Sequence, residues 1–442
     1  MRSLKFKGIL AILFAFVSVL GGASLRAQVV DLAKEPVQFS EIHDLWRFHT
    51  GDDSAWADPA FDDSQWQLLR SDLSWSEQGY RHYSGMAWYR FKLIVPKPSS
   101  GLGLYIPELS TSYQVFANGK LIGQLGEVPV HAEDYTGRGR QIIPLPDDLI
   151  NKDGVVRIAI RVSHRDHGGY SPGGPVSAIS VGNLSWLAEW KTLQLKEIFW
   201  AMSTQSTVML DYLLCGFAGL GMFALRRDER AYMWFAAASF FAATLWGMAV
   251  YPAYYLSPWH GYHAMETIIT VARFICFLLF LTSLLEARKG RVFWAAVASL
   301  AAIFLIAVPG LMGRLDWRLW AALDCLLTCG YMVCLLILIL RAARRGNLDA
   351  RLLFFPIVLW AAGISSDIVA APLLITHHLR SAVYLTYRRL VSWPMPVAFP
   401  VLAEFLALLS VLAVLILRFG RVHSDEDGAA TKLESVRMSR EF

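Results

Sequence analysis

Residues 401–418, VLAEFLALLSVLAVLILR, form an apolar run that contains one acid, Glu404, and ends in Arg418. A stretch of about 20 mostly apolar residues is long enough to cross the hydrocarbon core of a bilayer as a helix. Other stretches of the chain have the same character, and seven spans are expected in total. They lie near 199–225, 231–253, 264–286, 292–312, 317–340, 351–375 and 397–418. The sequence therefore predicts an all-α seven-helix transmembrane bundle that fills residues 191–418.

Composition agrees with a membrane protein. Of the 442 residues, 55% are hydrophobic and 17% are charged, against about 45–50% and about 25% in a typical soluble chain. The abundance of apolar and aromatic residues excludes intrinsic disorder. The net charge of +5 is too small to indicate a nucleic-acid partner. All five cysteines fall among the spans, where they are expected to pack as small hydrophobic residues, so no metal site and no cofactor are expected.

The first 27 residues have the pattern of a secretory signal peptide. A basic start (Arg2, Lys5, Lys7) precedes the apolar stretch 9–20, and small residues follow. Cleavage is expected after Ala23 or Ala27, and an uncleaved anchor stays open as the alternative. Residues 28–190 are then expected outside the cytoplasm.

The loops between the spans indicate the orientation of the bundle. Basic residues concentrate in every second connection. The richer set is Arg226, Arg227, Arg230, Arg288, Lys289, Arg291, Arg341, Arg344, Arg345, Arg351, Arg418 and Arg421, and the poorer set is Lys191, Lys196, Arg314, Arg318, Arg380, Arg388 and Arg389. Cytoplasmic loops carry the excess of Lys and Arg. A multi-pass protein of the inner membrane is predicted, with residues 28–190 outside and the 419–442 tail in the cytoplasm.

Residues 28–190 are predicted to form an all-β sandwich. Short alternating runs separated by turn residues favour strands, and Asn118-Gly119 is a typical two-residue hairpin turn. The expected strands are 86–95, 102–106, 113–117, 120–123, 141–144, 155–162 and 176–181.

Loops of this sandwich are where a ligand is expected, because binding residues concentrate on loops held by a rigid scaffold. Aromatic rings can stack on sugars, and Arg and His side chains can donate to hydroxyl or carboxylate groups. The candidate ligand-binding residues are Trp75, Tyr80, His82, Tyr83, Tyr135, Arg138, Arg140, His164, Arg165, His167 and Tyr170.

Five ionisable residues lie inside the predicted spans. They are Asp211, Arg273, Asp324, Asp367 and Glu404. Charges in hydrocarbon are costly and are usually paired or face a cavity, so a polar network centred on Arg273 is expected. Three roles stay open for it: a clamp that fixes helix packing, a two-state element that transmits a signal, or an ion pathway.

The exported region resembles the galactose-binding-like, sugar-binding jelly roll of family 2 glycoside hydrolases. The resemblance rests on Trp46-Arg47-Phe48, Gly51-Asp52-Asp53, Trp56, the stretch 61–66 (FDDSQW), Gly85, Trp88-Tyr89-Arg90 and the stretch 115–123 (VFANGKLIG). It implies a fold, since the catalytic acids of those hydrolases lie in a separate barrel for which this chain has no counterpart. Asp52, Asp53, Asp62, Asp63 and Trp66 are expected to form turns and to pack, and the chain is not expected to be an enzyme.

A jelly roll followed by seven spans also resembles the bacterial seven-transmembrane receptors with diverse intracellular signalling modules. Members of that family join an outside sensing domain to a cytoplasmic output domain, whereas only a short polar segment follows Arg418 here. The expectation is therefore a truncated gene product or a receptor that acts on a cytoplasmic signalling partner in trans, with a glycan or small polar molecule as ligand. The lipid bilayer is an expected partner, and a homodimer is one further possibility. A transporter or membrane-embedded enzyme that uses the intramembrane acids, and an adhesion or scaffold protein, are the alternatives.

Overall fold

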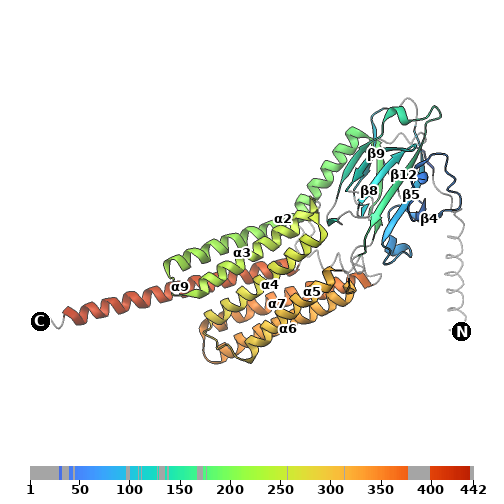
Figure 1. The fold of residues 1–442 in the computed structure, drawn as a ribbon. Helices are drawn as coiled ribbons and strands as arrows, with labels where there is room; N and C mark the ends of the chain where they lie inside the picture. The colour runs from blue at the N-terminus through green and yellow to red at the C-terminus, as the bar shows by residue number, and fades with distance from the viewer. Residues whose placement is uncertain are drawn as a thin grey trace, which may run out of the picture.

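A computed structural model describes most of the chain and shows a β-rich part joined to an elongated helical bundle (Figure 1). The described residues are 29–31, 39–42, 45–95, 100–107, 109–110, 112–126, 128, 135–136, 139–166, 173–175, 177–255, 257–312, 314–376 and 399–438. The predicted signal peptide lies outside them.

The β-rich part is a sandwich of two sheets. Strands of the larger sheet run in the order β4 (Gln67–Arg70), β3 (Leu45–Thr50), β5 (Gly85–Ile94), β12 (Val155–His164), β8 (Ser112–Ala117) and β9 (Lys120–Leu125), with β1 (Val29–Asp31) beside β5. The smaller sheet has the order β11 (Gln141–Pro144), β6 (Leu102–Ile106), β14 (Ile179–Asn183) and β2 (Phe39–Ile42). One short pair joins β7 (Leu109–Ser110) to β13 (Gly174–Pro175).

The apolar alternation seen in the sequence points into the space between the sheets. Along β12, Ile158 and Ile160 are buried in one core with residues of both sheets, because successive side chains of a strand point to opposite faces. The hairpin turn has the predicted geometry, with φ of 45° at Asn118 and 83° at Gly119, the sign that a type I′ turn requires.

Strands β3 and β4 did not figure among the strands expected from the sequence. Both are short, so each shows only one or two repeats of the alternation. Their pairing depends on contacts distant in the sequence, such as the stacking of Trp46 on Phe91 of β5 at 4.3 Å between ring centroids.

The Asp- and Trp-rich segment 51–66 folds over the outer face of the larger sheet. Arg90 of β5 is almost fully buried and donates to Asp63 at 2.8 Å and to the carbonyl oxygens of Trp56 and Asp58. The side chain of Asp62 accepts a hydrogen bond from the backbone N–H of Ser64 at 3.0 Å, as in an Asx turn. The described contacts of these motif residues thus hold a turn in place.

The Asp52 carboxyl makes the stability that this segment contributes to the fold depend on pH. Burial alone would raise the pKa of Asp52, but hydrogen bonds from Arg161 at 2.5 Å and Trp88 at 3.1 Å outweigh it and lower that pKa from 3.8. A carboxyl whose pKa is lower in the folded state stabilises the fold above its unfolded pKa and loses that contribution as the pH falls through the folded pKa. Asp52→Asn is expected to cost about 1 kcal/mol at neutral pH and to flatten the loss of stability below about pH 4. Acid unfolding followed by tryptophan fluorescence measures both, with exposed Asp148→Asn as the control.

Seven long helices make up the described part of the bundle. They are α2 (Leu184–Leu225), α3 (Arg230–Val250), α4 (Trp259–Leu284), α5 (Arg291–Leu311), α6 (Trp317–Arg344), α7 (Leu348–Thr376) and α9 (Phe399–Met438). Within the described residues, six are long and apolar enough to cross a membrane. The span expected at 351–375 lies in α7, where side chains beyond residue 364 fall outside the described residues. A multi-pass membrane protein with a β-sandwich and a helical bundle is the resulting fold.

Two helices extend beyond the apolar stretches that predicted them. Helix α2 begins at Leu184, directly after β14, with the side chain of Asn183 accepting from the backbone N–H of Ser185 at 2.9 Å. Helix α9 continues to Met438 and leaves the bundle at the end away from the sandwich (Figure 1). Hydropathy finds the membrane-length part of a helix and misses polar extensions.

Candidate functional site

The predicted ligand residues of the sandwich include four that meet in one aromatic cluster. Trp75 is fully buried and donates from Nε1 to the hydroxyl of Tyr89 at 2.7 Å. His164 is 4% exposed, and its ring lies edge-on to Trp75 at 5.6 Å between centroids. The ring of Tyr83 lies edge-on to both Trp75 and Tyr80. Tyr80 packs against Phe48 at 5.0 Å. Trp75 and His164 therefore belong to the core, and Tyr80 and Tyr83 form its partly exposed edge.

Beside this cluster lies an exposed polar pair. His82 has a positive φ of 62° and its Nδ1 lies 2.9 Å from Oδ2 of Asp166. The backbone N–H of Asp166 donates to Ser84 at 2.7 Å, and the neighbouring Arg165 is exposed. The structure thus brings His82 and Arg165 to the same edge of the sandwich as Tyr80 and Tyr83. His167, Tyr170 and Arg138, and the side chain of Tyr135, lie outside the described residues.

Arg140 has a different environment from the other ligand candidates. It is 9% exposed and its Nη1 donates to the carbonyl oxygen of Ala253 at 2.7 Å, in the loop that follows α3. Next to it, β10 (Tyr135–Thr136) pairs with β15 (Ser257–Pro258) in the α3–α4 loop. The hydroxyl of Tyr105 also donates to Gln194 of α2 at 2.5 Å. Arg140 thus contributes to the junction between the sandwich and the bundle.

The intramembrane charges are brought together only in part. Arg273 of α4 forms an ion pair with Glu404 of α9, and both side chains are buried. Asp211 and Asp324 make no hydrogen bond or ion pair with either of them among the described residues, and the side chain of Asp367 lies outside that part of the chain. Oδ2 of Asp211 is buried without a hydrogen-bond partner in the described part. The observed network therefore centres on one acid and one arginine.

Uncharged residues complete this site. The hydroxyl of Tyr212 donates to Oε1 of Glu404 at 2.6 Å and accepts from Arg273 at 3.0 Å. Trp246 donates from Nε1 to the same oxygen at 3.3 Å. The guanidinium carbon of Arg273 also lies 5.6 Å from the ring centroid of Trp360, within range of a cation–π interaction. Sequence reasoning missed Tyr212, Trp246 and Trp360 because neutral residues in an apolar run carry no signal of their own.

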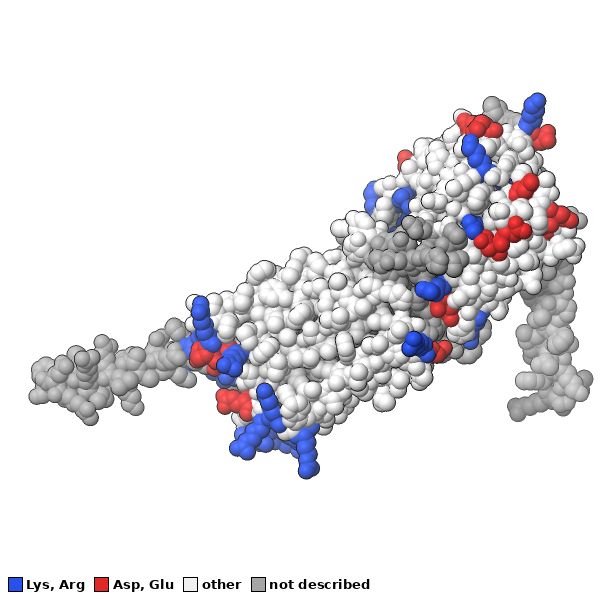
Figure 2. Space-filling view, viewed as in Figure 1, with Lys and Arg blue, Asp and Glu red and all other residues white. Residues whose placement is uncertain are grey.

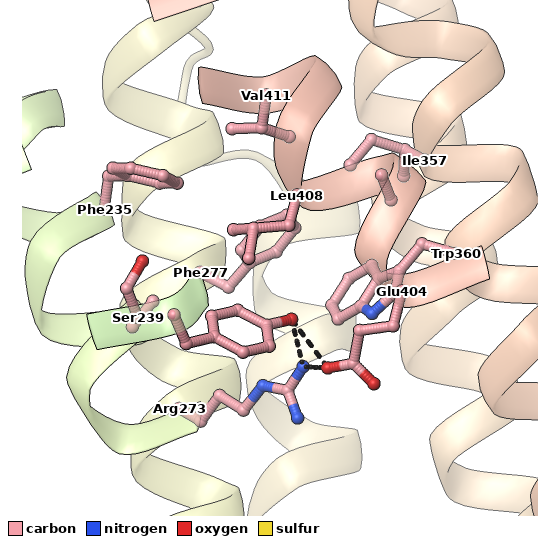
Figure 3. A pocket seen from close by; sticks show the side chains of 12 residues that line it. Phe235, Ser239, Arg273, Phe277, Ile357, Trp360, Glu404, Leu408 and Val411 are labelled. Carbon is pink, nitrogen blue, oxygen red and sulfur yellow. Dashed lines mark hydrogen bonds and ion pairs between the residues drawn. The ribbon is translucent and has the colours of Figure 1, made fainter. Parts of the chain in front are cut away.

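A cavity adjoins the ion pair, and Figure 3 shows the side chains around it. Its polar side is formed by Arg273, Glu404 and Tyr212, and its apolar side includes Phe235, Phe277 and Leu408. Trp360 lies between the two sides (Figure 3). Helices α2, α3, α4, α7 and α9 therefore all contribute to one partly polar site inside the bundle.

A second charged cluster lies at the end of the bundle away from the sandwich. Arg418 of α9 donates to the carbonyl oxygen of Leu284 at 2.8 Å, to Asp349 at 3.2 Å and to Glu229 at 3.3 Å. Arg421 also pairs with Asp349. We call these four charged residues, Arg418, Arg421, Glu229 and Asp349, the tail-side cluster. It holds α9 to the α2–α3 loop, to the end of α4 and to the first turn of α7, at the point where α9 leaves the bundle.

Basic side chains gather around the tail-side cluster, while the visible sides of the bundle are almost free of charge among the described residues (Figure 2). This distribution suits a protein whose middle is surrounded by hydrocarbon.

Comparisons with known proteins address the two parts separately. The sandwich is similar to parts of a Bacteroides uniformis β-glucuronidase (24% identity, TM-score 0.27), a Bacteroides vulgatus β-glycosidase (20%, 0.27) and a family 2 glycosyl hydrolase of Bacteroides cellulosilyticus (18%, 0.28). Each match covers 33% of this chain and 17%, 20% and 20% of those chains, respectively. This chain thus spans about a fifth of their length. A comparison with curated proteins found no match.

The bundle has a family match. Residues 212–414 match the model of the family described as 7TM diverse intracellular signalling. The matched segment begins at Tyr212 and includes Arg273 and Glu404. It therefore contains the ion pair and the residues around it, which we call the central site. The helical region of this chain thus matches the 7TM diverse intracellular signalling family over residues 212–414, and its long apolar helices are those of a multi-pass membrane protein.

Proposed function

We propose that this chain is a receptor of the cytoplasmic membrane that binds a carbohydrate-like or small polar ligand outside the cell and passes a conformational change to a signalling partner in the cytoplasm. The observation that carries the proposal is the course of α9. This one helix contains Glu404 of the central site and Arg418 of the tail-side cluster, and then continues to Met438. A change in the bundle can therefore reach the tail without an intervening loop.

The orientation in this proposal has two supports. The tail-side cluster is surrounded by basic side chains, as expected for cytoplasmic loops, and the sandwich lies at the other end of the bundle (Figures 1 and 2). A secretory signal in the first 27 residues would export the sandwich to the same side.

The link from the sandwich to the bundle has two routes. One is α2, which continues from β14 without a break. The other is the contact of Arg140 and β10 with the loop between α3 and α4. A ligand shifts a two-state equilibrium only by its difference in affinity for the two states, so the ligand must alter at least one of these contacts.

The proposed ligand surface is the edge that carries Tyr80, His82, Tyr83 and Arg165. These side chains combine aromatic faces with groups that can donate hydrogen bonds, a combination that suits a sugar or a small acid. Calorimetry of the full chain in lipid nanodiscs against a library of sugars and sugar acids tests the assignment. We expect a member of the library to bind and Tyr80→Ala with His82→Ala to weaken it by about tenfold or more, roughly the loss of one or two hydrogen bonds. Binding unchanged in the double variant would contradict this surface, and no binding by any member would count against a carbohydrate-type ligand.

Arg140 should affect coupling rather than binding. Arg140→Ala removes the hydrogen bond to the carbonyl oxygen of Ala253, a change of about 1–3 kcal/mol at the junction, and leaves the proposed ligand edge intact. We expect the ligand affinity measured by calorimetry to change less than threefold, about 0.6 kcal/mol. The ligand-induced change in hydrogen–deuterium exchange over residues 419–438 should become smaller. Arg157→Ala, at a partly buried arginine of the same sandwich, is the control. An unaltered ligand-induced change in the exchange of residues 419–438 in Arg140→Ala would show that the α3–α4 loop plays no part in coupling the sandwich to the tail.

A further inference from the structure

The cavity beside the Arg273–Glu404 pair contains two polar groups that the ion pair leaves unused. Trp360 is 4% exposed, and its Nε1–H has no hydrogen-bond partner among the described residues. Figure 3 shows this nitrogen on the side of the indole ring that faces Glu404. All three hydrogen bonds to Glu404 from described residues go to Oε1, which leaves Oε2 as an acceptor. A buried N–H group without a hydrogen-bond partner is costly, and Oε2 of Glu404 can accept a further hydrogen bond.

The size of the cavity limits which molecule could form hydrogen bonds with Nε1 of Trp360 and Oε2 of Glu404. It offers about 30 Å³ to the centres of water molecules, and one water needs about 10–15 Å³ on this measure. Two waters are thus about the capacity, and a sugar or a lipid headgroup is far too large. Apart from Ser239, the remaining walls are apolar, with Phe235, Phe277 and Val411 among them.

Charge decides between a neutral occupant and an ion. Arg273 and Glu404 neutralise each other as a pair, so the site as a whole offers no net charge to an ion. A cation would face the guanidinium group and an anion would face the carboxylate. A water molecule can accept from the indole N–H and donate to the carboxylate, and it gains both hydrogen bonds without a charge penalty.

We propose that this cavity is a water-binding site in which ordered water joins Nε1 of Trp360 on α7 to Oε2 of Glu404 on α9. A bridging water is nearly as favourable in enthalpy as a direct hydrogen bond. Glu404 then interacts with α2, α3, α4 and α7 at once, through Tyr212, Trp246, Arg273 and the water. The site is independent of the proposed ligand and holds whether or not the chain is a receptor.

The test is X-ray-generated hydroxyl radical labelling of the full chain in lipid nanodiscs, read by mass spectrometry. Radicals form from water in place, so a buried side chain beside bound water is oxidised while a dry one is not. Tyr212 lines the cavity. Tyr331 is the matched control, because it is fully buried in the same bundle, does not line the cavity, and donates its hydroxyl to the carbonyl oxygen of Phe274 at 2.7 Å.

We expect Tyr212 to be labelled several-fold faster than Tyr331, and Trp360→Phe to reduce the labelling of Tyr212 towards that of Tyr331. Ala407→Val, which narrows the cavity without touching a polar group, should do the same and serves if Trp360→Phe folds poorly. Equal labelling of Tyr212 and Tyr331 in the unaltered chain would show a dry cavity and overturn the proposal. Strong labelling of Tyr212 that persists in a folded Trp360→Phe or Ala407→Val variant would place the water elsewhere and overturn it as well.

Discussion

Glu404→Ala is expected to lower the free energy of unfolding of the bundle by about 3–5 kcal/mol, because it leaves the buried Arg273 charge without its partner. Arg273 makes its described hydrogen bonds to Glu404 and to Tyr212 only. Tyr212 would lose its acceptor in the same substitution. Unfolding by denaturant in mixed micelles, followed by far-UV circular dichroism, measures the change.

Two further variants make that prediction specific. Asp211→Asn alters the neighbouring acid of α2, which makes no contact with the pair among the described residues, and should change the stability by less than about 1 kcal/mol. The double variant Arg273→Met with Glu404→Leu removes both charges and should be more stable than Glu404→Ala, since replacing a buried pair by apolar groups is often neutral. If the double variant were as unstable as Glu404→Ala, the packing of the two side chains would determine the stability and their charges would not.

Arg418→Ala is expected to cost about 2–3 kcal/mol, the range for hydrogen bonds to charged groups, and to release the tail. Arg418 is the residue through which α9 contacts both Glu229 and the end of α4. Without it, backbone amides of 419–438 should exchange hydrogen faster, because local opening no longer requires these contacts to break.

Arg421→Ala is the matched control for the tail-side cluster. Arg421 contacts Asp349 as well, but its side chain is 44% exposed, against 13% for Arg418, so screening by water makes its contribution smaller. Hydrogen–deuterium exchange with mass spectrometry compares the two variants. Equal exchange in both, at the level of the unaltered chain, would show that the cluster does not restrain α9.

Much of the bundle was predictable because a membrane imposes a length and a polarity on each helix. The helices at α3, α5 and α6 begin within a few residues of the expected spans. The cost of unpaired charge in hydrocarbon led to the expectation of a polar network centred on Arg273, and of its four candidate acids Glu404 is the one that pairs with Arg273 among the described residues. The partners Tyr212, Trp246 and Trp360 did not, since an aromatic residue in an apolar run looks the same whether it faces lipid or a carboxylate.

The sandwich loops were harder to interpret for a related reason. Trp75 and His164 have side chains suited to binding, yet they are buried in the aromatic cluster. Arg140 resembled a ligand residue and instead contacts Ala253 of the bundle. Which face a loop residue presents depends on contacts across the fold that the local sequence does not encode. The tail-side cluster was missed because Glu229 lies in the α2–α3 loop and Asp349 in the first turn of α7. Both positions are outside the expected spans, where a charged residue carries no special signal.

The most direct test of the account is whether a ligand on the sandwich changes α9 beyond the membrane. The full chain in lipid nanodiscs, with and without the sugar or sugar acid that binds in calorimetry, would be compared by hydrogen–deuterium exchange over residues 419–438. A receptor that works through α9 should change its exchange rates there on saturation with the ligand, and Arg140→Ala should reduce that change. A ligand that binds the sandwich at full occupancy and leaves exchange at 419–438 unaltered would contradict the proposal that this helix carries the signal.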